Sequence, residues 1–302
     1  MTYPLGYPLA SSGTRDSAPR SGGFSATRPT NDLPPSSRLS ARKLAAIRER
    51  LSARDREVLE TVGQFRVMSG EQLQRLFWPV GAPQTRARLA RHGLSRLSEL
   101  GVLAPLARRV GGVRAGSRGL SFAVGLAGQR LLGAEESNRR VRHPHTPGER
   151  YLAHTLAVGQ LYVELVEAQR RSVVEVLDFD PEPGCWRPYA GPYGARLVLK
   201  PDAFLKLGVG DYEFSWLVEM DLATEALTTI ERKARRHLDY HRTGDAQRTQ
   251  GVSPRVVWIV PDQQRARAVE LALDRLPADS RRLFAVAVGA DAISLLTGGV
   301  RR

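Results

Sequence analysis

The sequence predicts an α+β domain of helices and one hairpin over residues 41–132, followed by a three-layer α/β domain over residues 149–302. The first observation is composition. Residues 1–40 are rich in Pro, Ser, Gly and Arg with few apolar residues, so we expect a disordered tail, and a second shift at 133–148 predicts a linker. The second observation is the spacing of apolar residues along the chain. It predicts helices and then a hairpin in the first domain, and the order α-β-β-β-α-β-α-β in the second. The third is the apolar run Val256–Val260, which is typical of a strand buried on both faces.

Length and composition exclude several classes of protein. The chain of 302 residues is long enough for two domains. It has no run of 18 apolar residues and no apolar core of a secretion signal, so neither membrane contact nor export is expected. The single cysteine, Cys185, excludes an intramolecular disulfide and a multi-cysteine zinc site. No GxxxxGK[ST] phosphate loop occurs, which argues against an ATPase. We expect a cytoplasmic protein.

The charge is distributed unevenly along the chain. Residues 1–150 hold 25 Lys and Arg against 11 Asp and Glu, whereas residues 151–302 hold 20 of each. The whole net charge of +14 therefore lies in the first half. A basic half beside a neutral half predicts a nucleic-acid-binding module joined to a second domain. Solubility charge on an arginine-rich surface is the alternative interpretation.

Two helix starts in the first domain carry capping signals. Ser52 and Asp55 have capping-box spacing at the start of a helix that runs to about Gly63. Ser69 and Gln72 have the same spacing at the start of the next helix. Both starts precede apolar residues at helical spacing, so two amphipathic helices are expected.

A third helix and a hairpin complete the first domain. The helix is predicted from about residue 84 to residue 100 and has one apolar stripe: Ala87, Ala90, Leu94 and Leu97. The segments "VLAPLARRV" and "LSFAVGL" then alternate like two strands around the tip "GGVRAGSRG". Three helices followed by a hairpin is the order of a winged helix-turn-helix domain.

The outer face of the third helix predicts contacts with double-stranded DNA. Its polar residues are suited to base edges and phosphates: Gln84, Thr85, Arg88, Arg91, His92 and Arg96. The hairpin adds basic residues for phosphates or a minor groove: Arg108, Arg109, Arg114 and Arg118. A solvated helix face is the alternative, but this face contains a single acid, Glu99, near its end.

Carboxylates gather on two strands of the second domain. The segment "VLKPDAFLKLGVGDYEFSWLVEMD" reads as two strands, with Asp202 on the first and Glu219 and Asp221 on the second. If the strands are neighbours, Asp202 lies beside Glu219. Two carboxylates about 4 Å apart repel by roughly 4 kcal/mol at an effective dielectric of 20, so they need a cation, a proton or compensating donors. Mg²⁺ or Mn²⁺ would suit oxygen ligands and could activate water against a phosphodiester.

Structural roles are the alternative for these residues taken singly. A Pro-Asp pair such as Pro201–Asp202 commonly begins a turn. Acids that precede a helix are favoured by the helix dipole. His237 and His241 are four residues apart on a predicted helix and could share a metal, but no Glu adjoins His237 as in the metalloprotease motif.

The order of elements, with Pro201–Asp202 on one strand and Glu219-Met220-Asp221 on the next, resembles the PD-(D/E)xK nuclease superfamily, which has a restriction-endonuclease-like fold. The resemblance implies that Asp202 and Glu219 hold the metal. It also implies a Lys two residues after the Glu, where this chain has Asp221. A Lys elsewhere could substitute: Lys233, on the following helix, is the preferred candidate, and Lys200 and Lys206, which flank Asp202, are the alternatives.

The chain also resembles the replication-relaxation family over roughly residues 50–275. The residues that carry this resemblance are "LSARDREVLETVGQFRVMSGEQLQRLFW", "RLSELGVL" and "VEMDLATE", together with Lys233 and Tyr240 downstream. The resemblance implies a DNA-binding protein of a plasmid or mobile element that acts in replication or relaxation, with other replication or transfer proteins as further partners. Two versions stay open: a metal-dependent DNA nuclease, and a non-catalytic regulator whose nuclease-like domain is a DNA- or protein-binding scaffold.

Overall fold

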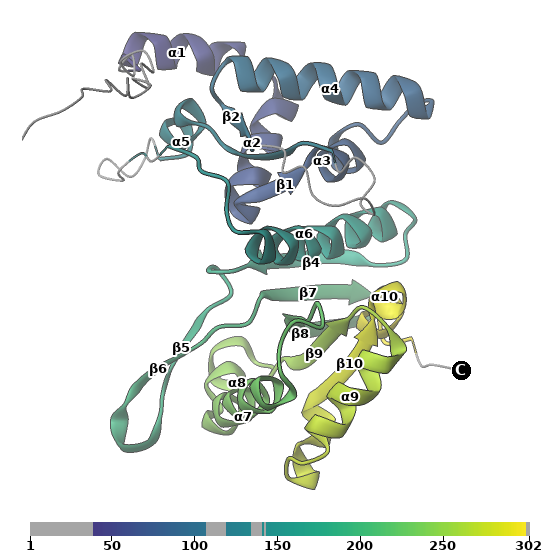
Figure 1. The fold of residues 1–302 in the computed structure, drawn as a ribbon. Coiled ribbons are helices and arrows are strands. Elements are labelled where there is room, and N and C mark those ends of the chain that lie inside the picture. The colour runs from purple at the N-terminus through teal and green to yellow at the C-terminus, as the bar shows by residue number, and fades with distance from the viewer. Residues whose placement is uncertain (1–38, 107–118, 134–140, 142, 300–302) are drawn as a thin grey trace, which may run out of the picture. The chain divides into compact units, whose positions relative to one another are not determined.

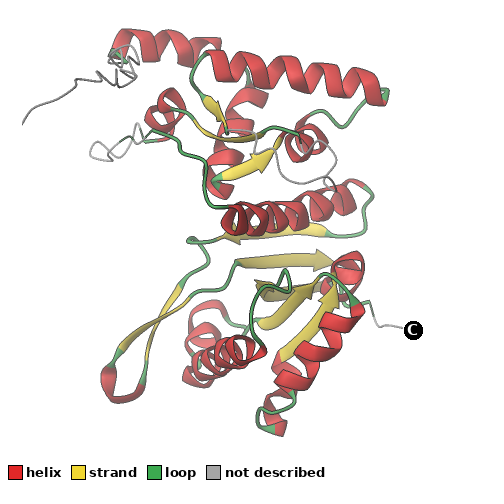
Figure 2. Ribbon diagram, viewed as in Figure 1, coloured by secondary structure: helices red, strands yellow, loops and turns green. Residues whose placement is uncertain are grey.

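The computed structural model describes residues 39–106, 119–133, 141 and 143–299, and these residues form a mixed α/β fold (Figures 1 and 2). Residues 39–302 belong to one compact unit. The predicted tail up to residue 38 and the tip of the predicted hairpin lie outside the described residues. Among the described residues, no helix has the length and apolar character needed to cross a membrane.

The N-terminal part contains the three predicted helices and additional short elements. Its helices are α1 (Ala41–Arg50), α2 (Ala53–Phe65), α3 (Gly70–Phe77), α4 (Pro83–Glu99) and α5 (Leu126–Leu132). Both predicted capping boxes are confirmed, because Ser52 and Ser69 each accept a bond from the N3 backbone while the N3 side chain bonds back. Three residues of the predicted stripe on α4 are buried, namely Ala90, Leu94 and Leu97.

A three-stranded antiparallel sheet joins these helices. It contains β1 (Val67–Ser69), β2 (Leu103–Pro105) and β3 (Ser121–Val124) in the order β1-β3-β2. The predicted ribbon is therefore present as β2 and β3, with β1 added at its edge. The elements β1, α1 and α5 were not predicted, since each is short and buries few side chains.

The C-terminal part is built on a five-stranded mixed sheet. Its strands are β4 (Glu175–Pro181), β7 (Ala203–Val209), β8 (Tyr212–Met220), β9 (Arg255–Val260) and β10 (Phe284–Val288), in the order β10-β9-β8-β7-β4. The pairs β10–β9 and β9–β8 are parallel, whereas β8–β7 and β7–β4 are antiparallel. The helices are α6 (Glu149–Arg170), α7 (Leu227–Thr243), α8 (Asp245–Gln250), α9 (Gln263–Leu273) and α10 (Ala292–Leu296).

Helices cover both faces of this sheet, so the packing has three layers. Side chains of α6 and α10 pack with one face, and side chains of α7 and α9 pack with the other. The predicted strand Val256–Val260 is buried at all five positions. A two-stranded ribbon that was not predicted, β5 (Arg187–Ala190) with β6 (Arg196–Leu199), lies between β4 and β7 in the chain.

Helix α6 also packs against the N-terminal part, on α3 and β1. Its apolar residues are spread around its axis, as expected of a helix buried on two sides. Polar contacts reinforce the packing: Arg75 of α3 donates two hydrogen bonds, of 2.8 and 2.7 Å, to the Glu167 carboxylate. Arg170 caps α3 by donating to the carbonyl groups of Arg75 and Leu76. One apolar core therefore runs from α2 and α3 through α6 to the sheet.

Candidate functional site

The predicted carboxylates lie at one end of two inner strands of the five-stranded sheet, β7 and β8. Strands β7 and β8 are antiparallel neighbours, and Ala203 pairs with Val218. The next position in this register puts Asp202 opposite Glu219, as expected if the two strands are neighbours. Asp202, Glu219 and Asp221 are all buried, with 8%, 3% and 3% of their surfaces exposed. What each carboxylate can do therefore depends on its protein partners.

Asp202 binds one backbone group and one histidine. Its Oδ2 accepts a hydrogen bond of 2.6 Å from the backbone N–H of Met220 at the end of β8. Its Oδ1 lies 3.1 Å from Nε2 of His154 on α6. The hydrogen bond to Asp202 raises the pKa of His154 above its ordinary value, against the opposing effect of burial. The contact therefore favours the protonated form of the His154 imidazole.

Glu219 lies between two basic residues of α7. Its Oε1 is 2.7 Å from Nε2 of His237, and its Oε2 is 3.0 Å from Nζ of Lys233. Lys233 also lies 3.1 Å from Oε2 of Glu225. Burial opposes the ionisation of Glu219, but the His237 hydrogen bond and the charges of His237 and Lys233 outweigh it and lower the pKa of Glu219. Burial likewise opposes the charge on Lys233, yet Glu219 and Asp202 raise the pKa of Lys233 above its ordinary value.

Asp221 occupies the position at which the nuclease resemblance implies Lys, and it is bound to a different helix. Its Oδ2 accepts a hydrogen bond of 2.6 Å from Nε of Arg265 on α9. Its Oδ1 accepts one of 2.9 Å from the backbone N–H of Ala223. The same guanidinium donates to the carbonyl oxygen of Glu225 at 2.7 Å. Asp221 thus fixes the turn between β8 and α7.

These contacts form a network of ion pairs rather than a set of metal ligands. Among the described residues, no group of three or more His, Cys, Asp or Glu side chains is placed to hold a metal ion. Asp202 and Glu219 each use both oxygens on protein partners. A six-oxygen Mg²⁺ or Mn²⁺ centre does not fit this arrangement, because every ligand would first have to lose a partner. Binding of either ion stays a prediction.

Three residues of the network, His154, His237 and Arg265, come from helices and were not predicted as part of the site. His154 precedes the buried Val158 and Leu161 of α6 by four and seven residues. His237 follows the buried Ile230 and Ala234 of α7 by seven and three residues. A histidine in register with an apolar stripe was the available signal. His241 lies elsewhere, with its Nδ1 2.8 Å from the Ser253 hydroxyl.

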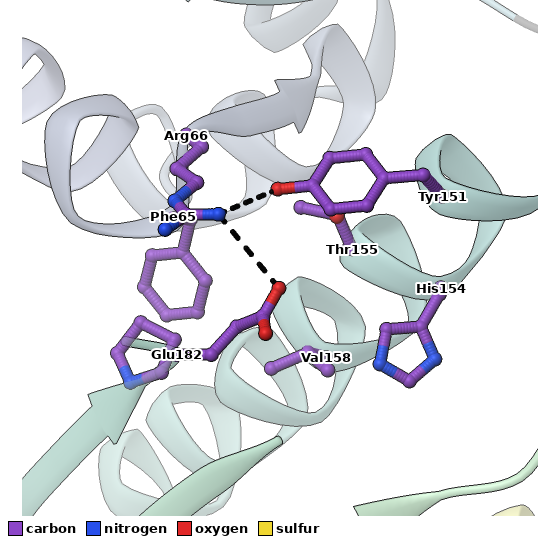
Figure 3. A pocket seen from close by; sticks show the side chains of 8 residues that line it. Phe65, Arg66, Tyr151, His154, Thr155, Val158 and Glu182 are labelled. Carbon is purple, nitrogen blue, oxygen red and sulfur yellow. Dashed lines mark hydrogen bonds and ion pairs between the residues drawn. The ribbon is translucent and has the colours of Figure 1, made fainter. Parts of the chain in front are cut away.

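A small depression lies next to His154, between α2, α6 and the end of β4 (Figure 3). Arg66 donates a hydrogen bond of 2.9 Å to the Tyr151 hydroxyl and lies 3.8 Å from Glu182 across it. Its volume of about 10 Å³ is roughly the space of one water molecule. It therefore has no room for a nucleotide.

The predicted DNA-binding face of α4 is largely exposed. Gln84, Thr85, Arg88, Arg91 and His92 are all exposed. Arg96 faces α2 instead, where its guanidinium lies 2.5 Å from Oδ1 of Asp55. Burial opposes the ionisation of Asp55, but the bonds from Arg96 and Ser52 lower its pKa. The predicted hairpin residues Arg108, Arg109, Arg114 and Arg118 lie outside the described residues.

The sequence model of one protein family matches most of this chain. The sequence model of the replication-relaxation family matches residues 59–256, which include α4 and the whole carboxylate network except Arg265. The chain belongs to the replication-relaxation family. Membership implies a role in replication or relaxation. Neither a curated protein nor a solved structure matches this member of the replication-relaxation family.

Proposed function

We propose that this protein binds double-stranded DNA through α4 during replication or relaxation, and that its N-terminal part is a winged helix. The order α2-β1-α3-α4-β2-β3, with its three-stranded sheet, supports this assignment. In such a domain the helix after the turn lies in the major groove. Helix α4 has 17 residues, a length of about 25 Å, which is sufficient to follow a groove.

The observation that carries the proposal is the outer face of α4. Its apolar side is buried against the domain, and its exposed side has two arginines and no acid before Glu99. Arg88 and Arg91 can bind guanine edges or phosphates, while Gln84 can bind adenine. Arg96 has no place in this interface, since it is paired with Asp55.

The C-terminal part acts in this proposal as a non-catalytic scaffold. Its carboxylates are buried, and each contacts basic side chains: His154 for Asp202, Lys233 and His237 for Glu219, and Arg265 for Asp221. A phosphodiester would therefore find no free acid among them. A metal-dependent nuclease is the second candidate, because Asp202 and Glu219 lie at the same end of the paired strands β7 and β8 and Lys233 contacts Glu219. Other replication or transfer proteins are candidate partners of the scaffold.

Binding to a fluorescent duplex tests the role of α4. We expect the double variant Arg88→Ala and Arg91→Ala to reduce affinity by about a hundredfold, since each charged contact contributes roughly 1.4 kcal/mol. The slope of log affinity against log salt should also fall by about 0.9 for each phosphate that the variant no longer neutralises. The control removes two exposed arginines of the C-terminal part, Arg267 and Arg282. Equal affinity of the α4 variant and the control would reject the assignment.

Cleavage assays separate the scaffold from the nuclease. The protein would be incubated with Mg²⁺ or Mn²⁺ and with supercoiled, linear duplex and single-stranded DNA. The scaffold predicts no cleavage of any substrate. Cleavage that disappears in Asp202→Asn and in Glu219→Gln would establish the nuclease instead.

A further inference from the structure

The ribbon formed by β5 and β6, here called the arm (residues 187–199), extends from the five-stranded sheet next to α7 (Figure 1). Only its base is anchored. Tyr189 and Leu199 are buried in the core shared with α7, and the Tyr189 ring meets the Tyr240 ring edge to face at 5.6 Å. The base therefore fixes the direction of the arm, while residues 192–198 of its outer part stay exposed among the described residues.

The outer part of the arm exposes an unusual set of side chains. Residues 192–198 are all exposed. Tyr193, at the tip, is fully exposed, and Leu197 and Val198 on β6 expose 38% and 46% of their surfaces. A two-stranded ribbon is only marginally stable alone, and a protein that exposes apolar side chains along one generally has a partner for it.

The charge of the arm indicates what this partner is. No acid occurs between Glu182 and Asp202, whereas Arg187, Arg196 and Lys200 lie within that stretch. Arg187 and Lys200 stack on Phe204 and Trp186 at the base, which leaves Arg196 exposed near the tip. Helix α7, which packs against both strands of the arm, adds the exposed Arg232 and Arg236. Arg235 is also exposed but lies 2.7 Å from Glu231, and Asp239 is an exposed acid of the same helix.

A polyanion fits this surface better than a second copy of the chain does. Two copies that paired through their arms would bring like charges together, which is unfavourable. DNA instead offers phosphates for the arginines and base steps for apolar side chains. Proteins that bend DNA commonly insert apolar residues, proline among them, between base pairs of the minor groove.

We propose that the arm is a second DNA-binding element that places Pro192 and Tyr193 in a minor groove. Arg196 then binds a flanking phosphate, and the α7 arginines bind the backbone beside it. The proposal extends the proposed function, since it requires that DNA be the ligand of this protein. It assigns DNA contacts to the half of the chain that has no net charge.

An arm-shortened variant tests the proposal. Residues 190–196 are replaced by Asn-Gly, which joins the cross-strand partners Tyr189 and Leu197 by a two-residue turn and keeps their register. The thermal midpoint should not change, because the removed residues are exposed. Affinity for a 40-base-pair duplex should fall about tenfold, the effect of one charged contact. Fluorescence transfer between the DNA ends should report less bending.

The point variants Tyr193→Ala and Arg196→Ala should lower bending and affinity, respectively, without any change of backbone.

The outcomes distinguish the arm from α4. Weaker DNA binding and less DNA bending after shortening would support the arm as a DNA-binding element, whether or not the α4 variant also binds DNA less tightly. Normal affinity and bending in a folded shortened protein would overturn it, even if the α4 variant fails to bind. A dimer that disappears on shortening while DNA affinity is unchanged, measured by sedimentation velocity, would show that the arm binds a second copy and would also overturn it. The single-charge control is Arg267→Ala.

Discussion

Glu219 shows how basic side chains can compensate the charge of a buried acid. It is 3% exposed, and isolated burial of its charge would be very costly. Lys233 and His237, one helical turn apart on α7, each approach one of its oxygens. The sequence was sufficient to predict that Asp202 and Glu219 lie on neighbouring strands and need compensating donors. The structure gives the two acids separate donors, with Asp202 bonded to α6 and Glu219 to α7, which cover opposite faces of the sheet. The sequence could not show that helices supply those donors, because that depends on how α6 and α7 pack.

A double-mutant cycle measures the Glu219–Lys233 pair. Glu219→Gln should destabilise the protein by about 3 kcal/mol, since it leaves two basic groups facing a neutral amide in the interior. Lys233→Met should cost less, about 1–2 kcal/mol, because Lys233 is partly exposed. The double variant should recover about 1 kcal/mol relative to the sum in urea unfolding.

The exposed pair of Lys206 and Glu213 provides the control for this cycle. Glu213 is 58% exposed, so Glu213→Gln should change stability by less than about 1 kcal/mol. Additive effects of Glu219→Gln and Lys233→Met on the free energy of unfolding would contradict the Glu219–Lys233 pair. Stabilisation of the wild type by Mg²⁺ that Glu219→Gln abolishes would favour the metal site.

His154 should make stability depend on pH. Its pKa is raised in the folded state, chiefly by the hydrogen bond to Asp202. The stabilisation is therefore fully present below the ordinary histidine value of 6.5 and is lost as pH rises through the folded-state value. In urea unfolding at several pH values, His154→Gln should remove this dependence, so its deficit against wild type should shrink as pH rises. The control is the exposed His241→Gln on α7, and a deficit that grows with pH would refute the assignment.

At the level of elements, local signals decided what could be predicted. Both capping boxes and the apolar run of β9 depend on neighbouring residues, and the structure has them as expected. The arm was missed because Pro188 and Pro192 interrupt the alternation of a strand. Arg96 was assigned to DNA because helical spacing cannot show that Asp55, 41 residues earlier, lies beside it.

Gly93, inside α4, lies against the ring of Trp78, a residue outside that helix. Glycine weakens a helix by about 1 kcal/mol relative to alanine, so propensity alone favours Gly93→Ala. A Cβ at this position would lie 2.7 Å from Cζ2 of Trp78. Overpacking of this kind costs about 1–3 kcal/mol, so we expect a net loss of about 1 kcal/mol in urea unfolding. Ser95→Ala on the exposed face is the control, and a stabilised Gly93→Ala would show that Trp78 moves freely.

For the whole molecule, the position of α6 predicts one cooperative unit from residue 39 onward. The helix contributes to a core that includes side chains of both α2 and β8, and its C-terminal end is fixed by polar contacts. Gln72 also donates a hydrogen bond of 2.7 Å to the carbonyl oxygen of Leu156.

We therefore expect a single calorimetric transition with equal calorimetric and van't Hoff enthalpies. Gln72→Ala with Arg75→Ala removes the bonds to Leu156 and Glu167, although Arg170 can still bond to the Leu76 carbonyl. We expect this double variant to separate the unfolding of the N-terminal part from that of the sheet. Arg267→Ala, which leaves the contacts of α6 intact, should keep the single transition. Two transitions in the wild-type protein would mean that α6 does not couple the unfolding of the two parts.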